Sequence, residues 1–201
     1  ATADPVVYAD MVRLADFIFG RLYLREPGCL PELYDDQWRP LPVEDGGYAD
    51  VGHQFEWAYL LSEARRRGFP ATYGAVADRL LQYGLRAGYD RDSGGIYSRA
   101  DYAGRPTGRG KGWWQQAELL RALMRHAAEG LGDELWNEFD QSLALVRAEL
   151  LDNEHGGWFG DVRPPAERDE RSGRKGNVWK VGYHAAGMYM EALRLTGQID
   201  R

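Results

Sequence analysis

Hydrophobic side chains recur every three or four residues in six stretches of the chain, the spacing that places them on one face of an α-helix. This pattern predicts helices over residues 7–25, 52–67, 70–88, 112–130, 133–151 and 179–196. One face of the first helix carries Met11, Leu14, Ala15, Ile18 and Leu22. Glycine ends several of these stretches, as Gly68 does after a run of arginines. The six helices are therefore expected to form three helical hairpins.

Short β-structure is expected in the connections between helices. Residues 90–98 combine aspartate, two adjacent glycines and residues that favour strands, and residues 101–108 are rich in turn formers. Such a segment is typical of a β-hairpin. Residues 152–159 repeat the pattern of aspartate, paired glycines and aromatic side chains. The predicted fold class is all-α, with short β-hairpins in the loops.

The second, fourth and sixth helices differ from the others in how they begin. Each opens on a cluster drawn from glycine, histidine, tryptophan and glutamate, at residues 52–57, 112–118 and 179–184. Such alternation is typical of an α/α toroid, which has an inner and an outer ring of helices. An α-solenoid, which also stacks helix pairs, could give the same alternation, but the three units are not close sequence repeats, which weakens that interpretation. We predict one domain over residues 1–201, an α/α toroid or the C-terminal half of one, with the clusters on one side.

The composition narrows the classes of partner. The 201 residues suffice for one domain with a core, and the net charge is −6. No basic face is evident, which argues against a nucleic acid or an anionic membrane as partner. No apolar run is long enough to span a bilayer, and no signal peptide opens the chain. Cys29 is the single cysteine and cannot form an internal disulfide, so we expect the protein to reside in the reducing cytoplasm. Motifs for metals and nucleotide cofactors are absent, and we expect neither.

Two histidines stand at matching places on alternate helices. His53 and Glu56 lie three residues apart and share one face of the second helix, where a carboxylate could fix the tautomer of an imidazole. Taken alone, such a pair is more often a capping glutamate beside a half-buried histidine. His184 opens the sixth helix, and two imidazoles facing one cavity suit proton transfer at both faces of a carbon atom. We interpret His126 and His155 as structural or solvent-exposed.

Aromatic residues accompany these histidines. Trp113 and Trp114 open the fourth helix and point in different directions, so that one can face a cavity while the other packs between helices. Glu118 lies one turn after Trp114, and Trp179 precedes His184. Aromatic faces with a few acids and bases are typical of sugar sites, although core packing explains any single tryptophan equally well.

Four stretches, in this order, resemble the N-acylglucosamine 2-epimerase family, whose superfamily includes cellobiose 2-epimerases and mannose or sulfoquinovose aldose–ketose isomerases. They are residues 52–58 (GHQFEWA), 113–118 (WWQQAE), 155–159 (HGGWF) and 175–184 (KGNVWKVGYH). Each motif is modest alone, whereas the ordered set is specific. The resemblance implies an (α/α)6 barrel with its site at the N-terminal ends of the inner helices. It also implies cofactor-free deprotonation at C2 of an open-chain aldose, from a mono- or disaccharide, through an enediolate.

The same resemblance implies roles for individual residues. His53 matches one acid/base histidine, Glu56 the residue that orients it, and His184 the second acid/base histidine. The positions that match the lining of the sugar site are Trp114, Glu118 and Trp179, with Trp113 beside them. Protonation of the enediolate at C2 from the opposite face gives an epimer, and protonation at C1 gives a ketose.

Length is the main departure from the family. Its members are about twice as long, and this chain matches their C-terminal half. An upstream histidine associated with ring opening and an upstream arginine have no counterpart here. Three hairpins cannot close a ring of six. The chain is therefore a fragment, or a second copy or a partner chain completes the barrel, or the barrel stays open and inactive. An open half would expose an apolar edge, which favours association.

Two other functions stay open on the sequence. A glycoside hydrolase on a similar toroid needs two opposed carboxylates, for which Glu56, Glu118 and Asp101 are candidates. The pair of histidines fits proton transfer better. A non-catalytic carbohydrate-binding or assembly half-barrel would keep the aromatic cleft without a complete site. Exchange of a sugar's C2 proton with solvent separates these functions, because only an epimerase or isomerase requires it.

Overall fold

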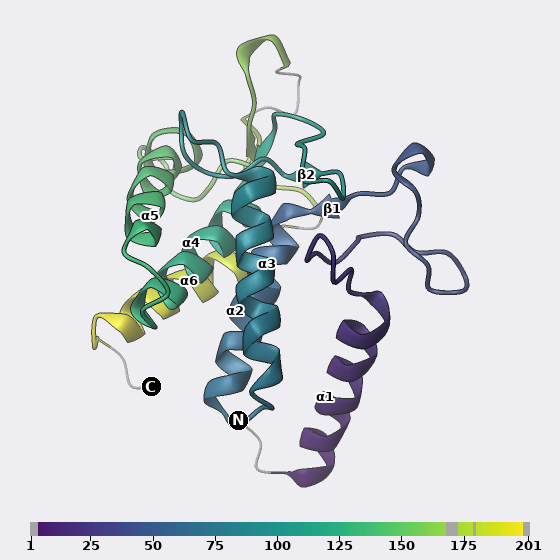
Figure 1. Cartoon of the computed structure of the whole chain (residues 1–201). Coiled ribbons are helices and arrows are strands. Elements are labelled where there is room, and N and C mark those ends of the chain that lie inside the picture. The colour runs from purple at the N-terminus through teal and green to yellow at the C-terminus, as the bar shows by residue number, and fades with distance from the viewer. Residues whose placement is uncertain (1–3, 168–172, 179, 199–201) are drawn as a thin grey trace.

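The computed structural model describes residues 4–167, 173–178 and 180–198. As the hydrophobic pattern predicts, these residues form six α-helices (Figure 1): α1 Pro5–Phe17, α2 Val51–Arg66, α3 Thr72–Gly88, α4 Trp113–Ala128, α5 Glu134–Leu145 and α6 Tyr183–Leu195. The first and fifth each continue into one π-helical turn, Ile18–Leu22 and Val146–Leu150, which accounts for the longer ranges expected there. None of the described helices is both long and apolar enough to cross a membrane.

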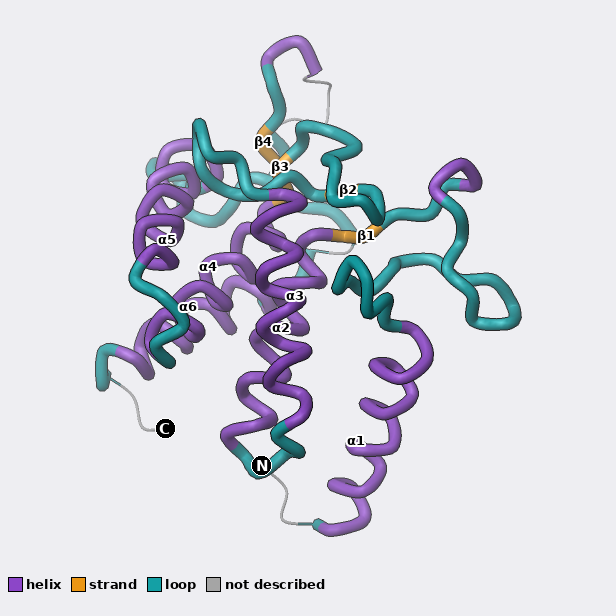
Figure 2. Tube along the Cα trace, viewed as in Figure 1, coloured by secondary structure: helices purple, strands orange, loops and turns teal. Residues whose placement is uncertain are grey.

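The central element of the fold is α4. It packs against α2, α5 and α6, while α3 packs on α2 (Figure 2). Most of its side chains are buried. One hydrophobic cluster joins α4 to α2 and α3 and includes Leu80 and Leu123, and a second joins it to α6 and includes Leu120 and Met188. The three helices that begin with the aromatic and histidine clusters are thus neighbours, with α4 in the middle.

Glycine allows α2 and α3 to approach closely. A Cβ atom on Gly84 would lie 2.6 Å from Cε2 of Phe55, and one on Gly88 would lie 2.6 Å from Cγ1 of Val51. Phe55 and Val51 are both fully buried. Because the ring of Phe55 packs directly on the backbone of α3, the position of α2, which carries His53, is fixed.

Four two-residue strands form two small antiparallel sheets in the described chain. The first pairs β1 (Ala49–Asp50) with β2 (Arg99–Ala100), and the second pairs β3 (Lys111–Gly112) with β4 (Asp161–Val162). Each sheet ties the residues before one of the cluster-bearing helices to the loop that follows the next outer helix. The expected β-structure of residues 90–108 is present: Ala100 forms an antiparallel bridge with Pro106 within that segment, and its strand β2 also pairs with β1.

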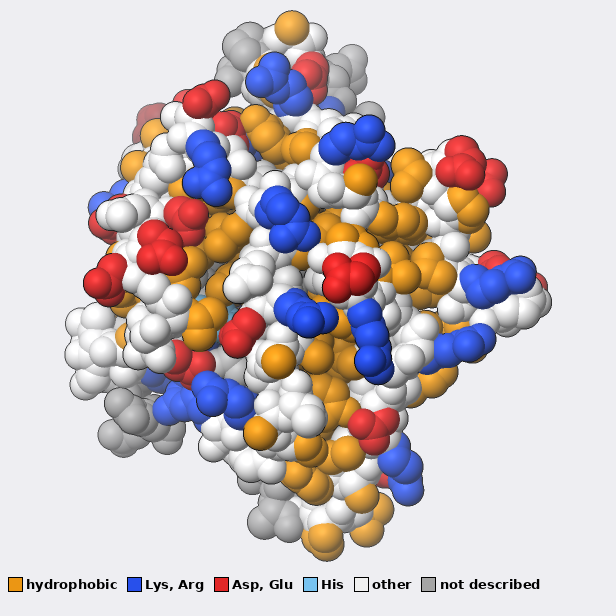
Figure 3. All heavy atoms as spheres, viewed as in Figure 1, with side chains coloured by type: hydrophobic (Ala, Val, Ile, Leu, Met, Phe, Trp, Pro, Cys, Tyr) orange, Lys and Arg blue, Asp and Glu red, His pale blue; other side chains and the backbone are white. Residues whose placement is uncertain are grey.

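Both ends of the helical array carry exposed apolar side chains. Of the stripe predicted on α1, Met11 and Leu14 are 48% and 59% exposed. On α6, Tyr189 and Met190 are 48% and 46% exposed. Figure 3 shows hydrophobic side chains on the surface over α1 and in the region beside it. The first and last helices are therefore open edges, as an incomplete ring predicts.

Candidate active site

A cavity of about 900 Å³ opens where α2, α4 and α6 begin. The side chains of His53, Trp113, Trp114 and His184 line it at the helix starts. The remaining wall comes from the loops around both small sheets and includes Arg99, Arg109, Asp161 and Asn177. The three cluster-bearing helices thus bring their N-terminal turns to one cavity, as their shared pattern predicts.

Two residues just before His53 set the start of α2. The carboxylate of Asp50 caps the helix by accepting hydrogen bonds from the backbone N–H groups of Gly52 (2.9 Å) and His53 (3.3 Å). A Cβ on Gly52 would lie 2.4 Å from Cγ of Gln115 and 2.9 Å from Cζ3 of Trp114. Only glycine therefore lets the first turn of α2 press against the first turn of α4, which brings His53 to Trp114.

The imidazole of His53 is held by Glu32 rather than by Glu56. Its Nδ1 lies 2.8 Å from Oε2 of Glu32, in the loop after α1. Burial lowers the pKa of His53, but the hydrogen bond to Glu32 and the charges of Asp50, Glu32 and Glu56 outweigh that effect, so the pKa is raised above its usual value. The expected orienting role of Glu56 is therefore corrected: Glu56 acts on His53 only through its charge.

The imidazole of His184 has an equivalent partner on the neighbouring helix. Its Nδ1 lies 2.8 Å from Oε1 of Glu118, and the Glu118 side chain is fully buried. Glu118 does not line the cavity, so its expected place on the sugar-facing wall is also corrected. It stands behind His184 and orients that ring, because a carboxylate that accepts Nδ1–H leaves Nε2 as the basic nitrogen.

The indole of Trp114 lies between the two histidines. Its ring centroid is 4.8 Å from that of His53 and 5.0 Å from that of His184. Trp113 is buried and meets Trp158 edge-on with 6.4 Å between ring centroids, yet it also borders the cavity, where its ring centroid lies 5.9 Å from that of His184. The predicted division of the two tryptophans therefore holds only in part: Trp114 spaces the histidines, whereas Trp113 both packs against Trp158 and forms part of the cavity wall.

Glu56 joins the His184 pair instead of the His53 pair. Carboxylate oxygens of Glu56 and Glu118 and a ring nitrogen of His184 lie within 4.8 Å of one another. Burial and the charge of Glu118 raise the pKa of Glu56. These three groups could ligate a divalent cation by geometry. However, one oxygen of Glu118 is engaged by His184, and the guanidinium of Arg121 lies 3.6 Å from the other, which disfavours a cation there.

Asp50 adds a second acid to the wall beside His53. It is 8% exposed, and burial is the main reason that its pKa rises to about 6. The charge of Glu32 raises this pKa further, whereas His53 lowers it. The His53 side of the cavity therefore holds two groups, Asp50 and His53, whose pKa values are both raised.

The remaining residues singled out by the sequence lie elsewhere. His126 is buried in α4, where burial lowers its pKa, and His155 is exposed in a loop, as expected for both. Asp101 is buried and accepts hydrogen bonds from Arg105. Trp179 lies outside the described residues.

Sequence reasoning missed Glu32 and Asp50. Asp50 carries a recognisable signal, since aspartate three residues before His53 is a typical N-cap at the start of a helix. Glu32 has no such signal, because it lies 21 residues before His53 in a loop of irregular structure. Only the path of the chain brings the two side chains together.

Comparison with known proteins identifies the family to which the chain is similar. Residues 1–187 match the sequence profile of the family described as N-acylglucosamine 2-epimerase (GlcNAc 2-epimerase). The chain is 37% identical over 130 residues to a mannose-6-phosphate isomerase of Rhizobium meliloti (strain 1021), a match that covers 62% of this chain and 33% of that protein. It is 28% identical over 186 residues to a cellobiose 2-epimerase of Bacteroides fragilis, covering 84% of this chain and 42% of that one.

A solved structure gives the same picture of the fold. The crystal structure of a sugar epimerase from a ruminal bacterium aligns with a TM-score of 0.79 and 16% identity, over 100% of this chain and 50% of that one. The six helices thus correspond to half of an (α/α)6 toroid, as predicted. The chain spans less than half the length of the two curated relatives it matches.

Proposed function

The chain belongs to the N-acylglucosamine 2-epimerase family, and from this premise we propose that it carries the acid/base half of a sugar epimerase or isomerase. In this proposal His53 and His184 move a proton at C2 of an open-chain aldose, supplied as a mono- or disaccharide. The residues act without a cofactor, because an imidazole with a carboxylate behind it is sufficient for general acid–base catalysis.

The observation that carries the proposal is the symmetry of the two histidine–carboxylate pairs about Trp114. Each Nδ1 is 2.8 Å from a glutamate oxygen, and each ring lies about 5 Å from the same indole. One Nε2 removes the C2 proton, and the electron pair moves into the C1 carbonyl to give an enediolate. Return of a proton to C2 from the other histidine inverts that carbon, whereas delivery to C1, with transfer of the O2 proton to O1, yields the ketose.

The charges around the cavity suit this chemistry. An enediolate is negative, and an imidazolium that forms during the transfer is stabilised by the glutamate at its Nδ1. The raised pKa of His53 favours its protonated form, which suits the acid. Trp114 supplies an apolar face between acid and base on which a sugar ring or chain can lie.

The exposed apolar edges at α1 and α6 indicate where the other half of a toroid would bind. A smaller hollow of about 390 Å³ lies along the outer side of α2, lined by Ile18, Leu22, Trp57 and Leu60 together with His53 and Glu56. The last helix, α6, presents exposed Tyr189 and Met190 at the other end of the array. Helices of the other half of a toroid would cover both edges. The proposed active form therefore includes these helices, from a second copy or from another polypeptide segment.

Proton NMR in D2O tests this function. The chain is incubated with mannose, glucose, N-acetylmannosamine, cellobiose and sulfoquinovose, and the C2 proton signal is followed together with new anomeric or ketose signals. We expect loss of the C2 signal for at least one sugar. A rate per chain that rises with protein concentration, together with dimers in sedimentation, would identify a second copy as the missing half. Absence of exchange at high protein concentration would contradict the catalytic proposal for this chain.

A non-catalytic half-barrel is the second candidate, and it is favoured by the 50% coverage of the aligned epimerase. It predicts sugar-induced shifts of the Trp114 signals with no deuterium exchange.

The glycoside-hydrolase alternative has less support. Of its three candidate acids, Glu118 and Asp101 are buried and engaged by His184 and Arg105 respectively, so neither can reach a glycosidic bond opposite Glu56.

A further inference from the structure

Behind the pair of His184 and Glu118 lies a buried arginine that the proton-transfer scheme does not use. Arg121 is one turn after Glu118 on α4 and is 9% exposed. Its NH1 atom lies 3.6 Å from Oε2 of Glu118. Neither atom has a hydrogen-bond partner among the described residues. The two buried atoms therefore form an ion pair that is shielded from solvent.

The position of Arg121 is set by two neighbouring helices. Its guanidinium lies flat against α2, with Cζ 3.8 Å from the ring centroid of Tyr59. On α6, a Cβ on Gly187 would lie 2.8 Å from both Cζ and NH1 of Arg121. The absence of a side chain at Gly187 thus leaves the space that the guanidinium occupies, one turn after His184.

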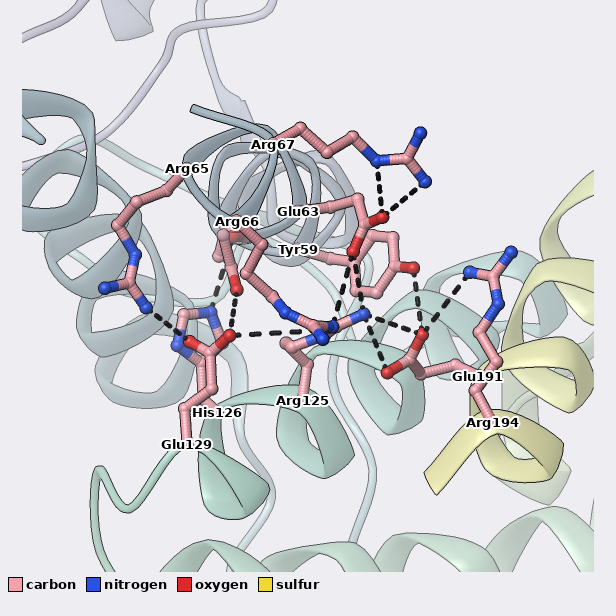
Figure 4. A network of polar contacts seen from close by, with 12 residues as sticks. Tyr59, Glu63, Arg65, Arg66, Arg67, Arg125, His126, Glu129, Glu191 and Arg194 are labelled. Carbon is pink, nitrogen blue, oxygen red and sulfur yellow. Dashed lines mark hydrogen bonds and ion pairs between the residues drawn. The ribbon is translucent and has the colours of Figure 1, made fainter. Parts of the chain in front are cut away.

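The neighbouring buried charges form a separate network and cannot replace Arg121. Arg125 donates from NH2 to Glu63 and Glu191, at 2.9 Å in each case, and the hydroxyl of Tyr59 donates to Glu191 at 3.0 Å (Figure 4). Arg125 is therefore already matched by two carboxylates. On the site side of Tyr59, Arg121 is the cation that faces Glu118.

This cation matters because it faces the second oxygen of Glu118, whose first oxygen lies 2.8 Å from Nδ1 of His184. The side chain of Glu118 is fully buried, and the carboxylate of Glu56 lies within 4.8 Å. Without the guanidinium, the carboxylate would no longer be held in line with Nδ1. Nδ1 would then lose its acceptor, and the ring proton would be free to move to Nε2. That tautomer cannot accept a proton from a ligand in the cavity.

We propose that Arg121 is a positioning residue that holds the carboxylate of Glu118 against Nδ1 of His184 and thereby keeps that ring in the tautomer with its proton on Nδ1 and a free Nε2. The groups that face Glu118 are Arg121 on its own helix, Glu56 on α2, and Tyr183 and His184 on α6. Of these, only Arg121 carries a permanent positive charge. The inference rests on the proposed role of His184, but the state of the ring can be measured without any turnover.

The test is the ¹⁵N NMR spectrum of the histidine side chains near neutral pH, in the full chain. Signals of His184 are assigned with H184N. In the wild type we expect the Nδ1-protonated tautomer of His184 to dominate. In R121M we expect the Nε2-protonated tautomer to become the major neutral form, and in R121K the wild-type tautomer to return. If the chain turns over a sugar, kcat should fall about tenfold or more in R121M with a smaller change in KM, as part of the ~10²–10⁴ that acid–base catalysis contributes.

G187A provides a variant that leaves every charged group in place. Alanine is a better helix former than glycine, so this chain is expected to fold even if R121M does not. The added methyl group displaces the guanidinium and should change the tautomer as R121M does. The matched control is R194M, because Arg194 pairs with buried Glu191 at 3.8 Å with the same three-residue spacing on α6. It should leave the His184 spectrum unchanged.

Two results would overturn the proposal: a wild-type His184 that is mainly protonated on Nε2, or a folded G187A with the wild-type tautomer and rate. Failure of the sugar assay in every variant would contradict the proposed function alone, because the ¹⁵N spectra would still decide the role of Arg121.

Discussion

Glu118 and His184 come from different helices and meet with 2.8 Å between Oε1 and Nδ1, the same separation that joins Glu32 to His53. The match is notable because the supporting carboxylates have unrelated origins. Glu118 is fully buried on α4, whereas Glu32 belongs to a loop and is partly exposed. Two unrelated elements thus hold the Nδ1 atoms of two imidazoles that line one cavity.

Replacing Glu118 with glutamine should abolish most of the C2 exchange. Glutamine preserves the volume, but it removes the negative charge that stabilises the imidazolium of His184 during proton transfer. We expect exchange to fall by about 10²–10⁴-fold, the usual contribution of acid–base catalysis. The measurement is the exchange rate in D2O, with circular dichroism to confirm the helices. An E118Q chain that exchanges at the wild-type rate would remove Glu118 from the site.

Replacing Glu32 with glutamine should lower the pKa of His53. The pKa is now raised because the hydrogen bond to Glu32 and nearby carboxylate charges outweigh burial. A raised histidine pKa stabilises the fold below the unfolded value near 6.5, and this stabilisation is lost as pH rises through the folded pKa. An NMR titration of His53 gives the shift directly. E56Q serves as the control, and it should lower the pKa of His53 less, since Glu56 acts only at a distance.

The sequence predicts those parts of the site whose residues lie close together along the chain, and it does not predict contacts between distant residues. Helical periodicity predicts the six helices, and the matching positions of His53 and His184 predict a shared cavity, because both signals are local. The same local spacing pairs Glu56 with His53. The structure instead gives that place to Glu32, since a loop can bring any side chain to a helix end. The sequence does not distinguish Arg121 from other arginines, because the burial of α4 on nearly every side follows from packing against its neighbours.

Asp50 should make folding stability depend on pH between about 4 and 6. Its pKa rises from 3.8 to about 6, so the folded chain binds more protons than the unfolded chain in this window. The free energy of unfolding therefore falls as pH rises through it. An asparagine in place of Asp50 would keep the N-cap without titrating, so the stability of D50N relative to wild type should increase by on the order of 3 kcal/mol from pH 4 to pH 7. Urea melts at both pH values measure this, and a constant difference would contradict it.

Replacing Gly52 with alanine should damage the site through packing alone. The added Cβ would stand 2.4 Å from Cγ of Gln115 and 2.9 Å from Cζ3 of Trp114, so α2 and α4 must separate or the indole must move. Overpacking of this kind costs about 1–3 kcal/mol. We expect a lower midpoint in thermal melts and a loss of the ring-current shifts that Trp114 imposes on His53. The control is G46A on the surface, where a Cβ meets no atom within 4 Å but the positive φ of 91° strains alanine; it should leave those shifts intact.

The central claim is that His184 exchanges a proton with C2 of a sugar. The direct measurement is the rate of C2 deuteration in D2O for the folded H184N chain relative to wild type, with the exposed His155 replaced in the matched control H155N. We expect exchange in the wild type and in H155N, and none above background in H184N. Exchange at the wild-type rate in a folded H184N chain would contradict it.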